Sequence, residues 1–193
     1  MNGMLSQKTL SKAFPTEWAL PWWEALLLLG SGALAVAMHR NLDFMEGAPG
    51  HHGIEWMALL IIGRACSRFR GAGSLTSVGA SFASLMPFWR GGDPFTPLLY
   101  LLPGPVMDLA FRYLPRYAEK IWFMMLLGGL ANMTKPLMRL VINLLTGWPF
   151  GSFRFDVAYP VVSHLFYGAF GGLLGALIIF GVNRLSAKNN SKG

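Results

Sequence analysis

Four polar side chains interrupt an otherwise apolar stretch in the second half of the chain: Asn132, Lys135, Arg139 and Asn143. On a helix of about 3.6 residues per turn they lie within about 80° of one another and form one polar face. Two cations on such a face suit an anionic substrate or the carboxylates of a partner protein. Two other interpretations stay open: the cations pair with Asp108 inside the protein, or they extend toward the headgroups of a bilayer.

Three histidines form a second candidate site. His51 and His52 lie in a stretch rich in turn-forming residues, 41–53, and His164 is expected near the same surface. Imidazoles beside a thioether such as Met45 suit a soft or borderline metal ion. Adjacent histidines in a loop usually point apart, however, and contact with an organic substrate fits these residues at least as well. We therefore place the three histidines in a substrate site and predict no metal site.

Two tryptophans are further candidates for the substrate site. Trp56 and Trp89 fall near the ends of apolar segments, where tryptophan ordinarily anchors a protein at the membrane interface. Their rings can also stack on a planar ligand. We include both in the predicted substrate site.

The chain carries no recognisable catalytic or cofactor motif. Its single cysteine, Cys66, excludes an internal disulfide and a Cys-x-x-Cys site. The sequence has neither His-Glu-x-x-His nor Gly-x-x-x-x-Gly-Lys-Ser/Thr, the signatures of zinc proteases and phosphate-loop NTPases. Asp108 and Arg112, four residues apart, are expected to form a structural ion pair. We predict a protein that is not an enzyme and needs no cofactor.

The composition identifies the class of protein that must position these residues. Apolar types make up 53% of the 193 residues and charged types only 13%, and the mean hydropathy is +0.44. A water-soluble domain carries about 25% charged residues. The sequence therefore predicts an all-α integral membrane protein.

Six apolar segments approach the length of about 20 residues that a membrane-spanning helix needs. They are Trp18–His39, Ile54–Phe69, Ala72–Trp89, Phe95–Tyr113, Ile121–Leu145 and Val161–Val182. We predict a six-helix transmembrane domain over residues 18–185, between a cytoplasmic N-terminal segment, 1–17, and a cytoplasmic tail, 186–193. A signal peptide cleaved after Ala35-Val36-Ala37 is the competing interpretation of the first segment, but Pro21 and Glu24 interrupt its apolar run.

The positive charges orient these segments. Eleven of the sixteen Lys and Arg residues fall on the side that holds both termini, which is the cytoplasmic side by the positive-inside rule. The net charge of +7 is thus a signal of topology, and we expect no nucleic acid to bind. In this orientation Arg139 and Asn143 lie in the outer half of the fifth segment. We expect both to contact substrate, while Lys135 holds the helix bent at Pro136 or contacts a partner.

Small residues and prolines predict how the helices pack. Gly73, Ser77, Ala80 and Ser84 share a face of the third segment, and His164, Gly168, Gly171 and Gly175 share a face of the sixth. Both faces are expected to pack inside the bundle, because small residues allow helices to approach closely in a bilayer. Pro94, Pro97, Pro103 and Pro105 predict a broken fourth segment, which a membrane tolerates where protein or a water-filled cavity covers the break.

The chain resembles an S component of the energy-coupling factor (ECF) transporters. The resemblance rests on six segments with both ends inside, on Ala33-x-x-x-Ala37 in the first segment, and on two stretches, Arg70–Ser77 and Arg90–Pro94. These stretches are most similar to the branch that handles thiamine or its hydroxymethylpyrimidine precursor. Members of that branch carry acidic residues in the third segment, whereas Ser77–Ser84 has none here. A neutral or anionic vitamin is therefore expected rather than thiamine.

The resemblance implies partners and a location. It implies a subunit of an ABC importer in the bacterial inner membrane that captures a vitamin-like molecule outside. A transmembrane coupling subunit and two cytoplasmic ATPase subunits would drive transport. By this resemblance Ala33 and Ala37 pack on the coupling subunit, and Gly30 extends the same face. The alternative is a non-transporting scaffold or accessory subunit of a larger membrane complex, with Lys135 among its partner contacts.

Overall fold

The computed structural model describes residues 20–41, 49–86, 93–153 and 156–190. Within these ranges the protein is all-helical and has no β-strand, which confirms the all-α part of the prediction. The elements are α2 (Trp22–Asn41), α3 (Gly53–Cys66), α4 (Ala72–Ser84), α5 (Thr96–Leu101), α6 (Pro103–Tyr113), the 3-10 helix η1 (Pro115–Tyr117), α7 (Ile121–Thr146), the 3-10 helix η2 (Gly151–Phe153) and α8 (Ala158–Asn190). The predictions for Trp89, Met45, 1–17 and Arg90–Gly92 fall outside the described residues.

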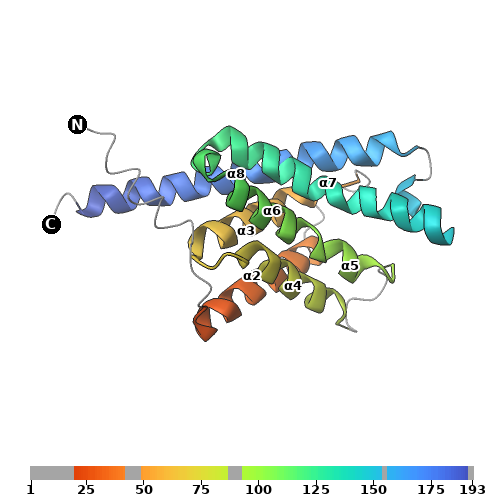
Figure 1. Ribbon diagram of the computed structural model, residues 1–193, viewed down its shortest axis with the longest axis horizontal. Coiled ribbons are helices and arrows are strands. Elements are labelled where there is room, and N and C mark those ends of the chain that lie inside the picture. Colours follow the sequence, from red (N-terminus) through yellow and green to blue (C-terminus); the bar gives the residue numbers. More distant parts are fainter. Residues whose placement is uncertain (1–19, 42–48, 87–92, 154–155, 191–193) are drawn as a thin grey trace.

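Two long helices, α7 and α8, lie side by side and cover the shorter helices α2 to α6 (Figure 1). The helices α2 and α8 are long and apolar enough to cross a membrane, over Trp22–His39 and Ala158–Lys188. The helix α3 has 14 residues, about 21 Å at 1.5 Å per residue, which is shorter than the ~30 Å hydrocarbon core of a bilayer. The helix α8, in contrast, has 33 residues and continues to Asn190, into the predicted tail.

The fourth segment is broken where its prolines predicted a break. The helix α5 ends at Leu101, and α6 begins at Pro103. Proline is tolerated in the first turn of a helix, where its missing N–H would have no partner in any case. Pro136, by comparison, lies within the continuous helix α7. There it removes only the one hydrogen bond that its N–H would otherwise donate to Asn132.

The glycine faces of the third and sixth segments pack inside the protein, as the sequence predicted. A Cβ on Gly168 would meet the Cβ of Asn132 and the carbonyl oxygen of Gly128 at 2.5 Å, so α8 and α7 touch backbone to backbone there. A Cβ on Gly73 in α4 would meet the carbonyl oxygen of Gly104 in α6 at 2.9 Å. Such contacts are the usual basis of helix association in membranes.

The expected pair between Asp108 and Arg112 is wrong. Asp108 pairs instead with Arg64 of α3, with 3.1 Å between Oδ1 and Nε. The carboxylate also accepts hydrogen bonds from the backbone N–H groups of Gly73 and Ser74, at 2.9 and 2.7 Å. These N–H groups open α4 and have no partner within the helix. The N-terminus of α4 attracts the Asp108 carboxylate more strongly than an exposed arginine such as Arg112 does.

Large apolar side chains also cover the outside of the long helices. Leu126, Leu130 and Leu137 of α7 are half or nearly half exposed, as are Phe166 and Phe170 of α8. The buried core lies on the other side of these helices and includes Met57, Met107 and Met124. Extended apolar surfaces of this kind mark contact with a membrane or another protein.

Candidate functional site

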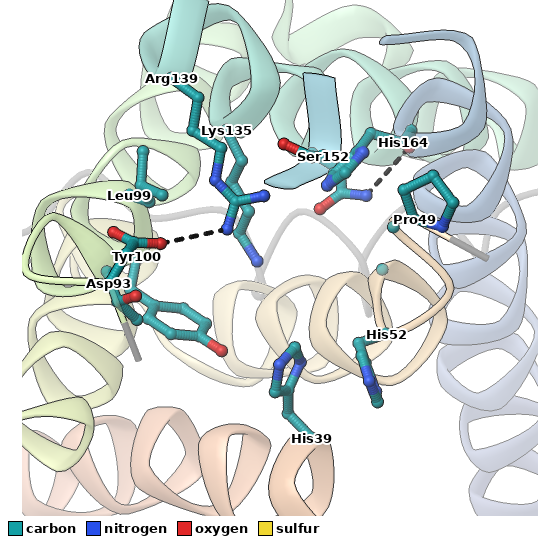
Figure 2. A pocket seen from close by; sticks show the side chains of 14 residues that line it. His39, Pro49, His52, Asp93, Leu99, Tyr100, Lys135, Arg139, Ser152 and His164 are labelled. Atoms are coloured by element: carbon teal, nitrogen blue, oxygen red, sulfur yellow. Dashed lines mark hydrogen bonds and ion pairs between the residues drawn. The ribbon is translucent and has the colours of Figure 1, made fainter. Parts of the chain in front are cut away.

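A cavity of about 380 Å³ opens at one end of the protein. This is the end where α2 and α7 finish and where α3 and α8 begin. Figure 2 shows charged, aromatic and imidazole side chains that enter it from several helices. The lining residues are His39, Pro49, Gly50, His52, Gly53, Asp93, Thr96, Leu99, Tyr100, Asn132, Lys135, Arg139, Ser152 and His164. The volume lies at the small end of the usual range for ligand pockets, about 300–1,000 Å³.

Lys135 lies against two aromatic rings at this cavity. Its Nζ is 4.5 Å from the centroid of the Tyr100 ring and 5.0 Å from that of Trp56. The two rings themselves meet edge to face, with centroids 5.3 Å apart. An ammonium over an aromatic face gains electrostatic attraction, about 0.5–2 kcal/mol depending on its hydration. Trp56, fully buried, thus supports the lysine from behind the cavity wall.

Arg139 lies one helical turn beyond Lys135 and has a counter-ion. Its Nη2 is 3.6 Å from Oδ2 of Asp93, a pair that Figure 2 marks at the edge of the cavity. Asp93 is held in place because its Oδ1 accepts the backbone N–H of Phe95 at 2.9 Å. The guanidinium carbon is also 5.7 Å from the centroid of the Phe150 ring. Part of the arginine's charge is therefore already neutralised by the protein.

Asn132 and His164 fix the opposite wall. The amide Nδ2 of Asn132 donates to the backbone carbonyl of His164 at 2.9 Å, which ties α7 to α8. The Nδ1 of His164 lies 2.7 Å from the carbonyl oxygen of Pro160. A carbonyl only accepts, so Nδ1 carries the hydrogen, and Nε2 of the neutral ring is a hydrogen-bond acceptor. Gly50 packs on this ring with φ of +85°.

Imidazole rings also line the cavity wall formed by α2 and the start of α3. The ring of His52 lies 3.7 Å from that of His39 and 3.6 Å from that of His51, centroid to centroid. Adjacent histidines 51 and 52 thus stack on each other, although neighbours in a loop were expected to point apart. Within the described ranges, no group of three or more His, Cys, Asp or Glu side chains is arranged to hold a metal ion.

The structure brings most of the predicted substrate residues together. Arg139, His164 and His52 line the cavity, and His51 and Trp56 lie directly behind lining residues. Asn143 does not line it: its Nδ2 donates to the carbonyl of Trp148 at 2.8 Å. This contact lies at the end of α7, where Gly147 adopts a left-handed conformation with φ of 70°. Trp89 lies outside the described residues.

The residues predicted to contact a partner protein lie in two regions, the cavity and the helix α2. Lys135 lines the cavity, although sequence reasoning placed it on the bend or on a partner. On α2, Gly30 is exposed, and a Cβ there would meet nothing within 4 Å. Ala33 and Ala37 are half-buried, and Ala33 packs against the hydrophobic core. Close backbone contact between α2 and α4 occurs at Gly32, which lies against Thr76, and at Gly79, which lies against Leu29.

Sequence reasoning did not place Tyr100, His39 or Ser152 in the site. One signal for Tyr100 was available, because Thr96, Leu99 and Tyr100 follow the i, i+3, i+4 spacing and share one face of α5. His39 ends a long apolar helix and carries no spacing that connects it to His52. Ser152 lies in a 3-10 helix between α7 and α8 that hydropathy does not reveal.

Comparisons with protein-family models, with curated proteins and with solved structures find no match to this chain.

Proposed function

We propose that this protein captures a small molecule in the cavity between α2, α3, α5, α7 and α8 and delivers it to a membrane importer. The cavity carries the proposal. It is small, it lies at one end of an apolar helical protein, and it concentrates two cations, three imidazoles and an aromatic ring in an otherwise apolar chain. A concave site with a few convergent polar groups is the usual form of a binding site for a small molecule.

The cavity also favours capture over a scaffold role. A scaffold would present the polar residues of α7 to a partner, whereas Lys135 and Arg139 are directed into a cavity within the chain (Figure 2). The chain has no nucleotide-binding motif, so transport against a gradient requires partner ATPases. This division of labour is the one that the resemblance to ECF S components implies.

In the proposed arrangement all six segments lie in the bacterial inner membrane, with both termini in the cytoplasm. The exposed apolar side chains of α7 and α8 support burial in lipid. Asp93, His52 and the cavity then face the outside, since the positive-inside rule puts Arg64, Arg112 and their neighbours at the cytoplasmic end. A molecule arriving from outside would enter the cavity directly.

Gentle purification with native mass spectrometry tests this function. We expect the wild-type protein to retain a small molecule and to co-purify with a coupling subunit and an ATPase pair. Ala33→Leu and Ala37→Leu enlarge two half-buried side chains of α2 and should reduce the co-purified ATPases without releasing the small molecule, with thermal unfolding to establish that each variant is folded. Leu34→Ala, on an exposed position of the same helix, is the matched control. Retention of the chain by an assembly that contains no ATPase would support the scaffold instead.

A further inference from the structure

The two cations of the cavity differ in what surrounds them. Arg139 has a carboxylate, Asp93, at 3.6 Å. Lys135 has none: among the described residues no carboxylate oxygen lies within 4.0 Å of its Nζ. Its close neighbours are the faces of Tyr100 and Trp56. Aromatic faces attract a cation, but they accept none of the ammonium's three hydrogen bonds in the way that an oxygen does.

Other donors at the same cavity are also without acceptors. The Nε of Arg139 and the Oγ of Ser152 are buried and have no hydrogen-bond partner within the described part of the chain. Both residues line the cavity together with Lys135. Buried polar atoms are nearly always hydrogen-bonded, so a cluster of donors without acceptors requires an explanation. Acceptor oxygens of a ligand would satisfy these two donors only after the side chains turn toward the cavity, because neither atom is accessible in this arrangement.

Charge leads to the same conclusion. The described lining residues include two basic side chains, Lys135 and Arg139, against one carboxylate, Asp93. The carboxylate of Glu55 attracts Lys135 only from beyond 4.0 Å, and it does not line the cavity. When both basic side chains are protonated, the described lining therefore carries a net charge of one positive unit. In a poorly hydrated site such a charge is costly unless an anion neutralises it.

We infer that Lys135 is the anion-binding residue of this cavity, and that the captured molecule carries a compact anionic group, a carboxylate or a phosphate. The inference rests on the proposed function and names the chemistry of its substrate. Figure 2 shows the lysine extending past the guanidinium of Arg139 to a position between Tyr100 and His39. The anion binds there to Nζ, and Tyr100 forms an aromatic wall for the rest of the molecule.

This assignment reverses the roles expected from the sequence. Arg139 was expected to contact substrate and Lys135 to hold the helix or a partner. In the structure the arginine is partly neutralised by Asp93, and the lysine is the group whose charge is still available to a ligand. The volume of about 380 Å³ corresponds to about a dozen water molecules at ~30 Å³ each. A cavity of this volume suits a single small molecule.

Benzoate, benzamide and benzylammonium are suitable probes, because they share a ring and nearly share a size but differ in charge. Isothermal titration calorimetry on the purified chain in lipid nanodiscs should show benzoate binding about ten- to a hundredfold more tightly than benzamide. Benzylammonium should bind most weakly. Phenyl phosphate, compared with benzoate, distinguishes a phosphate site from a carboxylate site.

Variants then test whether Lys135 causes the preference for benzoate over benzamide. Lys135→Gln should remove the tenfold or larger difference between benzoate and benzamide, while Lys135→Arg should keep it because the charge remains. Arg116→Gln is the matched control, since Arg116 is exposed in η1 and lies over the ring of Tyr117. Thermal unfolding establishes that each variant is folded, and Lys135→Arg provides the comparison if Lys135→Gln does not fold.

Three results would overturn the inference: equal binding of benzoate and benzamide, a benzoate preference that persists in Lys135→Gln, or no binding of any anionic probe. None of these would remove the importer role, which depends on co-purified ATPases. Conversely, a Lys135-dependent benzoate site in a protein that associates with no ATPase would keep the anion site and remove the importer.

Discussion

The protein holds two groups of buried charge, and they are built differently. At one end Arg64 and Asp108 satisfy each other: the arginine is 4% exposed, the ion pair is 3.1 Å long, and the carboxylate also accepts two backbone N–H groups of α4. At the other end Arg139 pairs with Asp93, Lys135 has no carboxylate within 4.0 Å among the described residues, and both border a cavity. The first group is complete without a ligand, whereas the second is complete only when something anionic enters.

This difference separates charges that hold the fold from charges that serve binding. A buried ion pair whose carboxylate also accepts backbone N–H groups fixes helices relative to one another, here α3, α4 and α6. Removing one partner of such a pair is costly because the other charge is left buried alone. A charge that lacks a close counter-ion in the folded protein already destabilises the fold. Removing that charge should therefore weaken ligand binding far more than it changes the free energy of unfolding.

The largest effect is expected at the complete pair. Asp108→Ala leaves Arg64 buried without a counter-ion and α4 without its N-terminal acceptor. We expect the free energy of unfolding to fall by about 3–5 kcal/mol, measured by unfolding in mixed micelles of increasing SDS content. Arg64→Met/Asp108→Asn removes both charges and keeps an acceptor oxygen, so it should lose less than Asp108→Ala. A loss below about 1 kcal/mol in Asp108→Ala would contradict a structural role for the pair.

A smaller effect on stability is expected at the incomplete group. Lys135→Met removes a cation that no carboxylate balances, and methionine fills a similar space against Trp56 and Tyr100. The lost cation–π attraction and the recovered desolvation cost oppose each other, so the free energy of unfolding should stay within about 1 kcal/mol of wild type or rise. The same unfolding assay checks this. A loss as large as that of Asp108→Ala would show that Lys135 holds the fold.

The smallest effect is expected at the boundary between protein and ligand. Asp93 neutralises part of Arg139, and the side chains of this pair are 21% and 26% exposed. Asp93→Asn should therefore change stability by no more than about 1 kcal/mol. It should also tighten benzoate binding about two- to fivefold, because a competing negative charge is gone. Calorimetry measures the change, and weaker binding would mean that Asp93 positions Arg139 for the ligand.

The periodicity and hydropathy of the sequence were sufficient for the helical class and for the approximate positions of the helices. Each of the six apolar segments contains a helix, and the fourth is interrupted at Pro103 as its prolines predicted. These properties are local, because proline geometry and glycine faces act within a turn or two of the chain. The polar face of α7 could be recognised for the same reason, since its residues lie on a single helix.

The partners of each charge, by contrast, were decided only by tertiary structure. Asp108 lies four residues from Arg112 in sequence, yet it binds Arg64 and the start of α4, because the contact of α4 with α6 brings unsatisfied N–H groups to the carboxylate. Arg139 meets Asp93, which precedes α5, and Lys135 lies over the rings of Tyr100 and Trp56. The sequence determined that this chain places cations in an apolar helix. The packing of α3, α5 and α7 determined which cation is left for a ligand, because a counter-ion acts only from within a few ångströms and residues distant in sequence supply it.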